Sequence, residues 1–385
     1  MILELLKPVE DIAVAHNTLL SEFSLGKKIK IHTKKNGLPE LDRAQIAIIG
    51  VKEDRGTVDN AGTGNGLEKI RKHIYQLFPG NWFVDILDLG NIEAGEKIED
   101  TYFAVKSILR ELMRQNITPI VIGGGQDLTY AQYAAYESVA QGVNMVAIDH
   151  RFDLGLVEDK MHAQNFMHRI ILDQPNNLFH YTNIGFQTYF NAQDQIELID
   201  KLHFDAYRLG EVTPDLKILE PVFRDADMIS VDIGAVRMSE APGNMNATPN
   251  GFYGDEICAL SRYAGISHKN KSFGIYEFNS KKDRDEQTSH LIAQMIWYFI
   301  EGYNYRIEED PFAEKDAFQK YIVPIEQDTI VFYKSNRSER WWMEIMYFHN
   351  KIKKTTLIPC TYQDYLTANN QVFPERWLKT FRKLS

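Results

Sequence analysis

The stretch NMVAIDHRFD (144–153) joins an apolar run of strand length to two carboxylates, Asp149 and Asp153. Continuous apolar runs of this kind are typical of strands that are buried on both faces, as in a parallel sheet. Five further runs have the same character: AQIAIIGV (44–51), TPIVIGGG (118–125), FHYTNIGF (179–186), DMISVD (227–232) and KSFGIYEF (271–278). Most of them end in polar or glycine-rich residues. The sequence therefore predicts a mainly parallel sheet.

Helical patterns lie between and after these strands. Residues 101–116 and 288–303 both place apolar side chains at helical spacing. Strands that alternate with helices indicate βαβ units, so we expect a three-layer α/β/α fold around the parallel sheet. Ligands bind beyond the carboxyl ends of the strands in such sheets. The polar residues that close the strands are therefore the first candidates for chemistry.

The composition of the chain excludes several classes of protein. Its 385 residues are 44% hydrophobic with a net charge of −10, which argues against general nucleic-acid or membrane binding. Two distant cysteines fit neither a disulfide framework nor a zinc site. The N-terminus lacks the pattern of a signal peptide, and no run reaches the roughly 18 apolar residues of a membrane helix. We expect a cytoplasmic protein that does not insert into membranes.

Several blocks of sequence follow one another in an order that resembles a known family. These blocks are residues 46–78, VIGGGQDLTY (121–130), DHRFD (149–153), SVDIGAVRMSEAPG (230–243) and YEFNSKKDRDEQT (276–288). Taken singly, an aspartate at a strand end or a glycine run is usually a turn or cap. In order and spacing, the blocks resemble the arginase, agmatinase and formimidoylglutamase family, the ureohydrolases, over about residues 44–303. NIGFQTYFN (183–191) is most similar to the formimidoylglutamase branch.

The resemblance implies an arginase-like fold with two manganese ions that activate a water for attack on a guanidinium or formimino carbon. The six positions that would hold the ions are Gln126, Asp149, Arg151, Asp153, Asp232 and Gly234. One ion would be held by Gln126 and the three aspartates, and the amide oxygen weakens this site without abolishing it. The second would need Arg151, which stays protonated, and Gly234, which has no side chain. We therefore expect one weakened metal site at most.

The arginine in DHRFD suggests a substitute for the missing cation. A guanidinium carries positive charge and can bind two carboxylates, so we expect Arg151 to bridge Asp149 and Asp232 at the second metal position. Arg237 stands where the family has an acidic residue. The pocket, which also includes Asp127, is therefore expected to prefer anions over guanidinium cations.

Two further positions match residues that act in the family. The resemblance implies that His162 shuttles protons or contacts the substrate, although the glycine that follows it in the family is Ala163 here. It also implies that Glu277 holds the cationic end of the substrate. His162 and Glu277 are thus the expected catalytic residues if the chain is active.

Three functions remain open on these residues. We favour a ureohydrolase-fold pseudoenzyme, without the two-manganese centre, that serves binding or assembly. The first alternative is a divergent hydrolase of linear amidine C–N bonds that works with one metal, and the second is a sensor of small anionic ligands. No cofactor is expected in the favoured case, whereas manganese or another divalent cation would occupy the weakened site in the first alternative.

The ends of the chain lie outside the family match. We expect an N-terminal extension (1–43) and a C-terminal extension or small subdomain (304–385) on either side of the arginase-like domain (44–303). The aromatic C-terminal segment, with Trp341 and Trp342, either packs as a satellite core or exposes a docking surface for a protein partner. The resemblance also implies a homo-oligomer.

Overall fold

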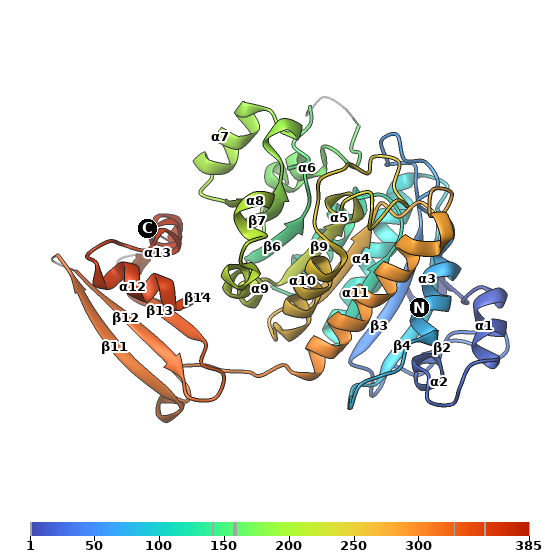
Figure 1. The fold of residues 1–385 in the computed structure, drawn as a ribbon, viewed down its shortest axis with the longest axis horizontal. Coiled ribbons are helices and arrows are strands. Elements are labelled where there is room, and N and C mark those ends of the chain that lie inside the picture. Colours follow the sequence, from blue (N-terminus) through green and yellow to red (C-terminus); the bar gives the residue numbers. More distant parts are fainter. Residues whose placement is uncertain (1, 141, 157–159, 327, 350–351, 385) are drawn as a thin grey trace.

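The computed structural model describes residues 2–140, 142–156, 160–326, 328–349 and 352–384. Within these ranges, a ten-stranded sheet lies between two layers of helices (Figure 1), which confirms the expected three-layer α/β/α fold. Its order is β1-β4-β3-β5-β10-β9-β6-β7-β8, with β2 beside β4, and only β1 is antiparallel to its neighbour. The strands are β1 (Leu6–Lys7), β2 (Lys30–Ile31), β3 (Ile46–Lys52), β4 (Ile86–Glu93), β5 (Thr118–Ile122), β6 (Val143–Ile148), β7 (Leu178–Phe186), β8 (Asp205–Arg208), β9 (Met228–Asp232) and β10 (Ser272–Tyr276).

Alternate side chains of each central strand enter two separate cores. In β3, Ile46 and Ile48 pack on one face of the sheet, whereas Ala47 and Ile49 pack on the other. The first face is covered by α1 (Asp11–Thr18), α2 (Leu25–Lys28), α3 (Leu67–Gln76), α9 (Glu220–Asp225), α10 (Gly254–Ile266) and α11 (Gln287–Asn304). The second face is covered by α4 (Ile98–Arg114), α5 (Leu128–Ala134), α6 (Phe166–Leu172) and α7 (Gln193–Lys201). No helix among the described residues is long and apolar enough to cross a membrane.

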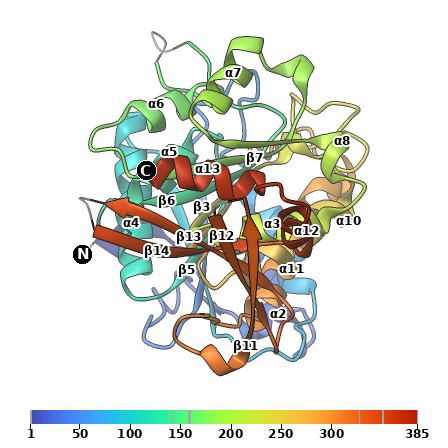
Figure 2. The ribbon, with the colours of Figure 1, turned by 90° about the vertical axis from the view of Figure 1, so that its left-hand side faces the viewer.

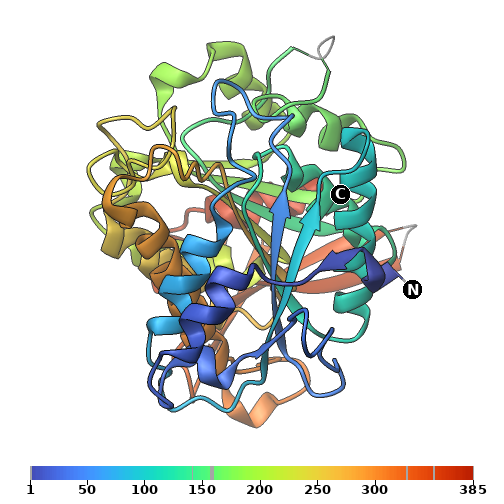
Figure 3. The same cartoon turned by 90° about the vertical axis from the view of Figure 1, so that its right-hand side faces the viewer.

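The N-terminal residues belong to the main sheet through β1 and β2, which both pair with β4. Figure 3 shows this segment, in dark blue, along the β3–β4 side of the molecule. Arg71 of α3 joins it to the core, because the buried guanidinium contacts Asp88 of β4 at 2.8 Å and Glu10 at 3.4 Å. A buried arginine with two carboxylate partners holds the segment to the sheet.

The C-terminal residues form a second sheet of four antiparallel strands, beside the main sheet in Figure 1. Its elements are β11 (Phe318–Ile325), β12 (Asp328–Ser335), β13 (Trp341–His349), β14 (Ile352–Cys360), α12 (Tyr362–Asn369) and α13 (Glu375–Leu384). Trp341 and Trp342 are 8% and 6% exposed, so they pack in cores rather than on a docking surface. Arg224 of α9 reaches this unit, because its Nη2 donates to the carbonyl oxygens of Trp341 (3.0 Å) and Cys360 (3.3 Å).

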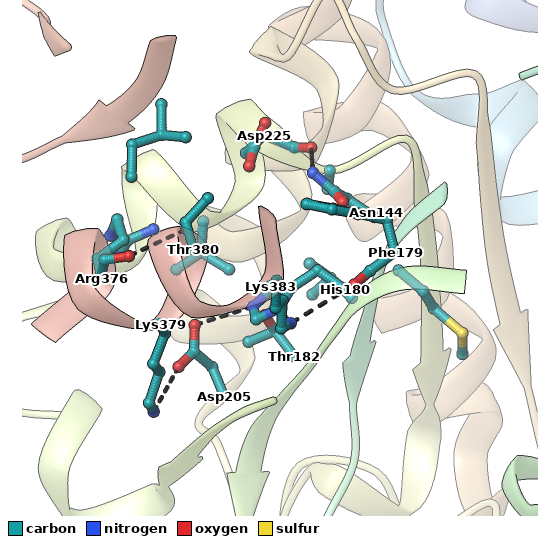
Figure 4. A pocket seen from close by; sticks show the side chains of 15 residues that line it. Asn144, Phe179, His180, Thr182, Asp205, Asp225, Arg376, Lys379, Thr380 and Lys383 are labelled. Atoms are coloured by element: carbon teal, nitrogen blue, oxygen red, sulfur yellow. Dashed lines mark hydrogen bonds and ion pairs between the residues drawn. The ribbon is translucent and has the colours of Figure 1, made fainter. Parts of the chain in front are cut away.

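Helix α13 lies between the second sheet and the β7–β8 edge of the main sheet (Figure 2). Lys379 of α13 contacts one oxygen of Asp205 at 2.8 Å, and His180 contacts the other at 2.9 Å (Figure 4). Lys383 contacts the second ring nitrogen of His180. Burial by itself opposes the ionisation of Asp205, but the hydrogen bond and charge of His180 and the charge of Lys379 lower its pKa overall. This largely buried acid is thus compensated by the charge of Lys379 and by its hydrogen bond with His180.

Candidate metal centre

Neighbouring strands of the main sheet carry the predicted acids at their carboxyl ends. β9 ends at Asp232, β6 is followed directly by Asp149, and β10 is followed directly by Glu277. The strands are adjacent in the order β10-β9-β6 and parallel, and the register pairs Tyr276 with Asp232. The three carboxylates therefore leave the sheet at one edge, as the strand-end rule predicts.

A glycine turn after β5 brings Gln126 to the same edge. Gly124 has a φ of +81°, and a Cβ there would lie 2.2 Å from a methyl carbon of Leu128 and 2.9 Å from the carbonyl oxygen of Glu53. Only glycine fits this turn. Nε2 of Gln126 donates to Oγ of Ser230, two residues before Asp232 on the same strand face, at 3.0 Å. Oε1 of Gln126 is buried and has no hydrogen-bond partner among the described residues.

Asp149 lies close enough to the other two aspartates of the centre to raise their pKa. Burial and the charge of Asp149 raise the pKa of Asp232 to about 7. Burial, again reinforced by the charges of Asp149 and Asp232, raises the pKa of Asp153 well above its ordinary value. Oδ1 of Asp149 accepts the backbone N–H of Arg151 at 2.8 Å, while its buried Oδ2 has no N–H or hydroxyl partner in the described ranges. Asp232 alone of the three is partly exposed.

His150 lies within this group of acids. Its side chain is almost fully buried, and Nδ1 is 3.3 Å from Oδ1 of Asp149. Asp149, His150 and Asp232 each offer one atom that could bind a metal, and these three atoms lie within 4.8 Å of one another. His150 was not predicted from the sequence, because the resemblance assigns the metal ligand to position 151. The signal was nonetheless present as a histidine directly after the strand-ending aspartate.

Glu277 is held in place beside Gln126. Oε2 accepts from Nδ2 of Asn60 at 2.7 Å, and Oε1 accepts the backbone N–H of Gln126 at 2.9 Å. Burial, with the charge of Asp232, raises the pKa of Glu277 well above its ordinary value despite these hydrogen bonds. Glu277 and Asp153 both have left-handed backbones, with φ of 65° and 52°. Non-glycine residues in this conformation concentrate at functional sites. Asn60 was not predicted, because nothing local distinguishes it in the sequence.

Asp127 and His162 lie on two loops that both contact Gly56. A Cβ on Gly56 would lie 2.3 Å from the carboxylate of Asp127, and the carbonyl oxygen of Gly56 accepts the N–H of Ala163 at 2.8 Å. Asp127 accepts from the hydroxyl of Tyr102 at 2.6 Å, and burial raises its pKa to about 6. His162 is half-buried, and its Nδ1 accepts the backbone N–H of Gln164 at 3.1 Å.

The two arginines do not take the places that the sequence suggested. Nη1 of Arg151 donates to the carbonyl oxygen of Phe190 at 3.2 Å, and the guanidinium lies 4.8 Å from the centre of that ring. No ion pair joins the Arg151 guanidinium to Asp149 or Asp232 in the described part of the chain, so the expected bridge is not formed. Arg237 donates to the carbonyl oxygen of Gly251 and stacks on Tyr253. Aromatic rings and carbonyls satisfy both guanidiniums.

Comparison with known proteins places this geometry in a family. The sequence pattern of the arginase family matches residues 44–301. The chain belongs to the arginase family. The match covers the strands whose carboxyl ends carry the acids, and it leaves the second sheet outside.

Relatives of this arginase-family chain include formimidoylglutamases of two staphylococci. The Staphylococcus haemolyticus protein is 26% identical over 273 residues, which cover 67% of this chain and 86% of the relative. The Staphylococcus aureus protein is 26% identical over 270 residues, which cover 66% and 85%. The chain thus spans most of the length of these relatives and adds sequence of its own.

Solved structures share the arginase-like fold. Formiminoglutamase of Trypanosoma cruzi, crystallised with Mn²⁺, aligns with a TM-score of 0.63 at 19% identity and covers 70% of this chain and 96% of its own. Agmatine ureohydrolase of Thermoplasma volcanium aligns with a TM-score of 0.60 at 20% identity, covering 78% and 99%. The expected arginase-like fold is confirmed.

Proposed function

We propose that this arginase-family chain is a divergent hydrolase of linear amidine C–N bonds that works with a divalent cation, manganese being the first candidate. Asp149, Asp153, Asp232 and Gln126 would hold the cation. The formimidoylglutamase relatives support the reaction class, and the manganese in the Trypanosoma cruzi structure supports the metal. This proposal replaces the pseudoenzyme that the substituted ligand positions favoured.

The proposal rests on a set of buried oxygen atoms that could bind a cation and that lack N–H or hydroxyl partners. Oδ2 of Asp149 and Oε1 of Gln126 accept no hydrogen bond from an N–H or hydroxyl group of the described residues. The Asp149 carboxylate instead lies against that of Asp153, and burial, the charge of Asp149 and a shared hydrogen bond raise the pKa of Asp153. Buried polar atoms are normally paired, and carboxylates that repel one another in a buried place normally neutralise or bind a cation. Carboxylate and amide oxygens are ligands that Mn²⁺ accepts. The residues of the centre therefore fit a divalent cation.

The chain's own residues would position the amidine for hydrolysis. When bound, the cation would supply a water of lowered pKa and polarise the carbon under attack. Glu277 is fixed by Asn60 and the Gln126 backbone, and each carboxylate oxygen still has a free lone pair for an amidine N–H. His162 would exchange protons from its loop.

Specific observations bear on the other two functions. The loss of side-chain ligands at Arg151 and Gly234 favours the pseudoenzyme, which stays the second candidate. The anion sensor has less support, because both guanidiniums are already engaged by carbonyl oxygens and aromatic rings.

The test is an assay of the full chain loaded with Mn²⁺. Formiminoglutamate, agmatine and arginine would be supplied in turn, and formamide, urea and ammonia would be measured. We expect one substrate to give product, and Asp149→Asn to reduce the rate to that of Mn²⁺ in buffer. If wild-type protein binds Mn²⁺ yet releases no more product than Asp149→Asn, the pseudoenzyme is correct.

A further inference from the structure

We infer that Asp149, His150 and Asp232 form a cation-binding position with an imidazole ligand, distinct from the all-oxygen set of Gln126, Asp149, Asp153 and Asp232. This inference rests on the proposed function only in that both place a divalent cation at this edge of the sheet. Neither the composition of the chain nor the family resemblance pointed to His150.

The first support is the state of the His150 ring. The side chain is 2% exposed, and neither ring nitrogen has a hydrogen-bond partner among the described residues. Its one polar contact is the 3.3 Å approach of Nδ1 to Oδ1 of Asp149. A buried imidazole normally has at least one partner, since an unpaired polar group costs about 1–3 kcal/mol. A divalent cation would be such a partner, because ligand atoms of Asp149 and Asp232 lie within 4.8 Å of one another and of the ring.

The second support is the space that Gly234 leaves. A Cβ at this position would lie 3.1 Å from Cε1 of His150 and 3.0 Å from Oδ1 of Asp232. A side chain at 234 would therefore press against both the ring and the carboxylate. Because glycine stands there, the imidazole can lie where a longer residue at 234 would otherwise project. The histidine at 150 and the glycine at 234 thus form a complementary pair.

The third support is that the Arg151 guanidinium forms no ion pair with Asp149 or Asp232 in the part of the chain that the structure describes. Its guanidinium is held on Phe190, and the same ring packs edge-on against His150 at 5.1 Å. Phe190 therefore fixes both side chains of the DHRFD loop in one arrangement. The charge of Arg151 lowers the pKa of Asp153 and Asp232 only in part, because burial and the charge of Asp149 outweigh it.

The ligand set indicates the class of cation. Two carboxylates favour hard divalent ions, whereas an imidazole favours first-row transition metals over Mg²⁺ and Ca²⁺. A position with both ligand types suits Mn²⁺, Fe²⁺, Co²⁺ or Zn²⁺. Mn²⁺ is the most useful probe because its unpaired electrons report directly on nitrogen ligands.

The test is pulsed electron paramagnetic resonance of the full chain with one equivalent of Mn²⁺, alongside a titration of Mn²⁺ affinity. We expect nitrogen coupling from a bound imidazole in wild type, and its loss in His150→Ala with a Kd at least about tenfold weaker. Gln126→Ala, which changes only the all-oxygen set, should keep the coupling. Arg151→Ala should keep it as well, because its guanidinium lies on Phe190.

Gly234→Ala provides a second variant that keeps every ligand. Its new Cβ should displace the ring and weaken the nitrogen coupling while leaving the unfolding curve of the metal-free protein close to wild type. Coupling that persists in His150→Ala, or wild-type Mn²⁺ without coupling, would overturn the inference. Wild-type protein that shows the coupling but hydrolyses no amidine supports the inference and overturns the proposed hydrolase. Wild-type protein that hydrolyses an amidine but shows no nitrogen coupling supports the proposed hydrolase and overturns the inference.

Discussion

Two buried aspartates of this chain have opposite electrostatic surroundings. Asp205, at the α13 interface, lies between His180 and Lys379, and these partners lower its pKa in spite of burial. Asp232, at the metal centre, is held beside Asp149 and Asp153, and its pKa is raised to about 7. The first acid has an ion-pair partner in Lys379 and a hydrogen bond from His180. The second has no ion-pair partner among the described residues, and in the proposed function a divalent cation would take that place.

Replacing the compensated acid should have the larger effect on stability. Asp205→Asn keeps the side-chain volume but leaves Lys379 and Lys383 near a neutral amide at the interface. We expect the free energy of unfolding at pH 7 to fall by about 3 kcal/mol in urea denaturation, because the mostly buried Lys379 would then keep only the exposed Glu375 as an ion-pair partner. Asp42→Asn, at an exposed position, is the control and should change stability by less than about 0.5 kcal/mol. Equal effects of the two variants would contradict the comparison.

Replacing the uncompensated acid should act in the opposite direction. Because the pKa of Asp232 is raised, the folded state ionises this group at a cost above pH 7, and Asp232→Asn removes that cost. With EDTA at pH 8, we expect the variant to be more stable than wild type by about 2 kcal/mol. Its Oδ1 can still accept the N–H of Gly234.

Added Mn²⁺ should make wild type more stable than Asp232→Asn. It should raise the thermal midpoint of wild type and leave that of Asp232→Asn nearly unchanged, since a ligand stabilises only a state that binds it. Destabilisation of the variant in EDTA would show that the acids of the centre do not repel one another.

The smallest expected effect is a pH dependence from the α13 interface. Burial lowers the pKa of Lys383 to about 8, against the attraction of Asp205 and with the repulsion of Lys379. The unfolded chain therefore binds the extra proton between about pH 8 and 10.4, and stability should rise with pH in this window. Lys383→Met should remove about 1 kcal/mol of this rise in urea titrations at pH 8 and pH 10. Parallel curves for wild type and variant would exclude Lys383 as the source.

The sequence predicts most strands of the main sheet because apolar runs are a local signal. It does not predict β4 (Ile86–Glu93), whose Asp88 and Asn91 look unsuited to a buried strand. Both are nevertheless buried, since Arg71 of α3 donates to each of them. A hydrogen-bond partner on a different element makes these polar residues compatible with the core. The local sequence pattern of β4 contains no information about such a partner.

The same limit applies to the candidate metal centre. The strand-end rule locates Asp149, Asp232 and Glu277, because each follows its strand directly. The place of His150 depends on the space beside Gly234, which lies in the turn after strand β9, and this space exists only after the sheet has formed. The direction of the Arg151 side chain depends in the same way on Phe190, which lies 39 residues further along the chain.

The contacts of Arg224 also bear on the order in which the nascent chain can fold. This arginine is 4% exposed, and its acceptors are carbonyl oxygens 117 and 136 residues later in the chain. During synthesis, α9 therefore leaves the ribosome well before the strands whose carbonyl oxygens accept from Nη2 of Arg224. These two hydrogen bonds can form only after residue 360 has emerged, so the contact between the arginase-family region and the second sheet is made late in synthesis.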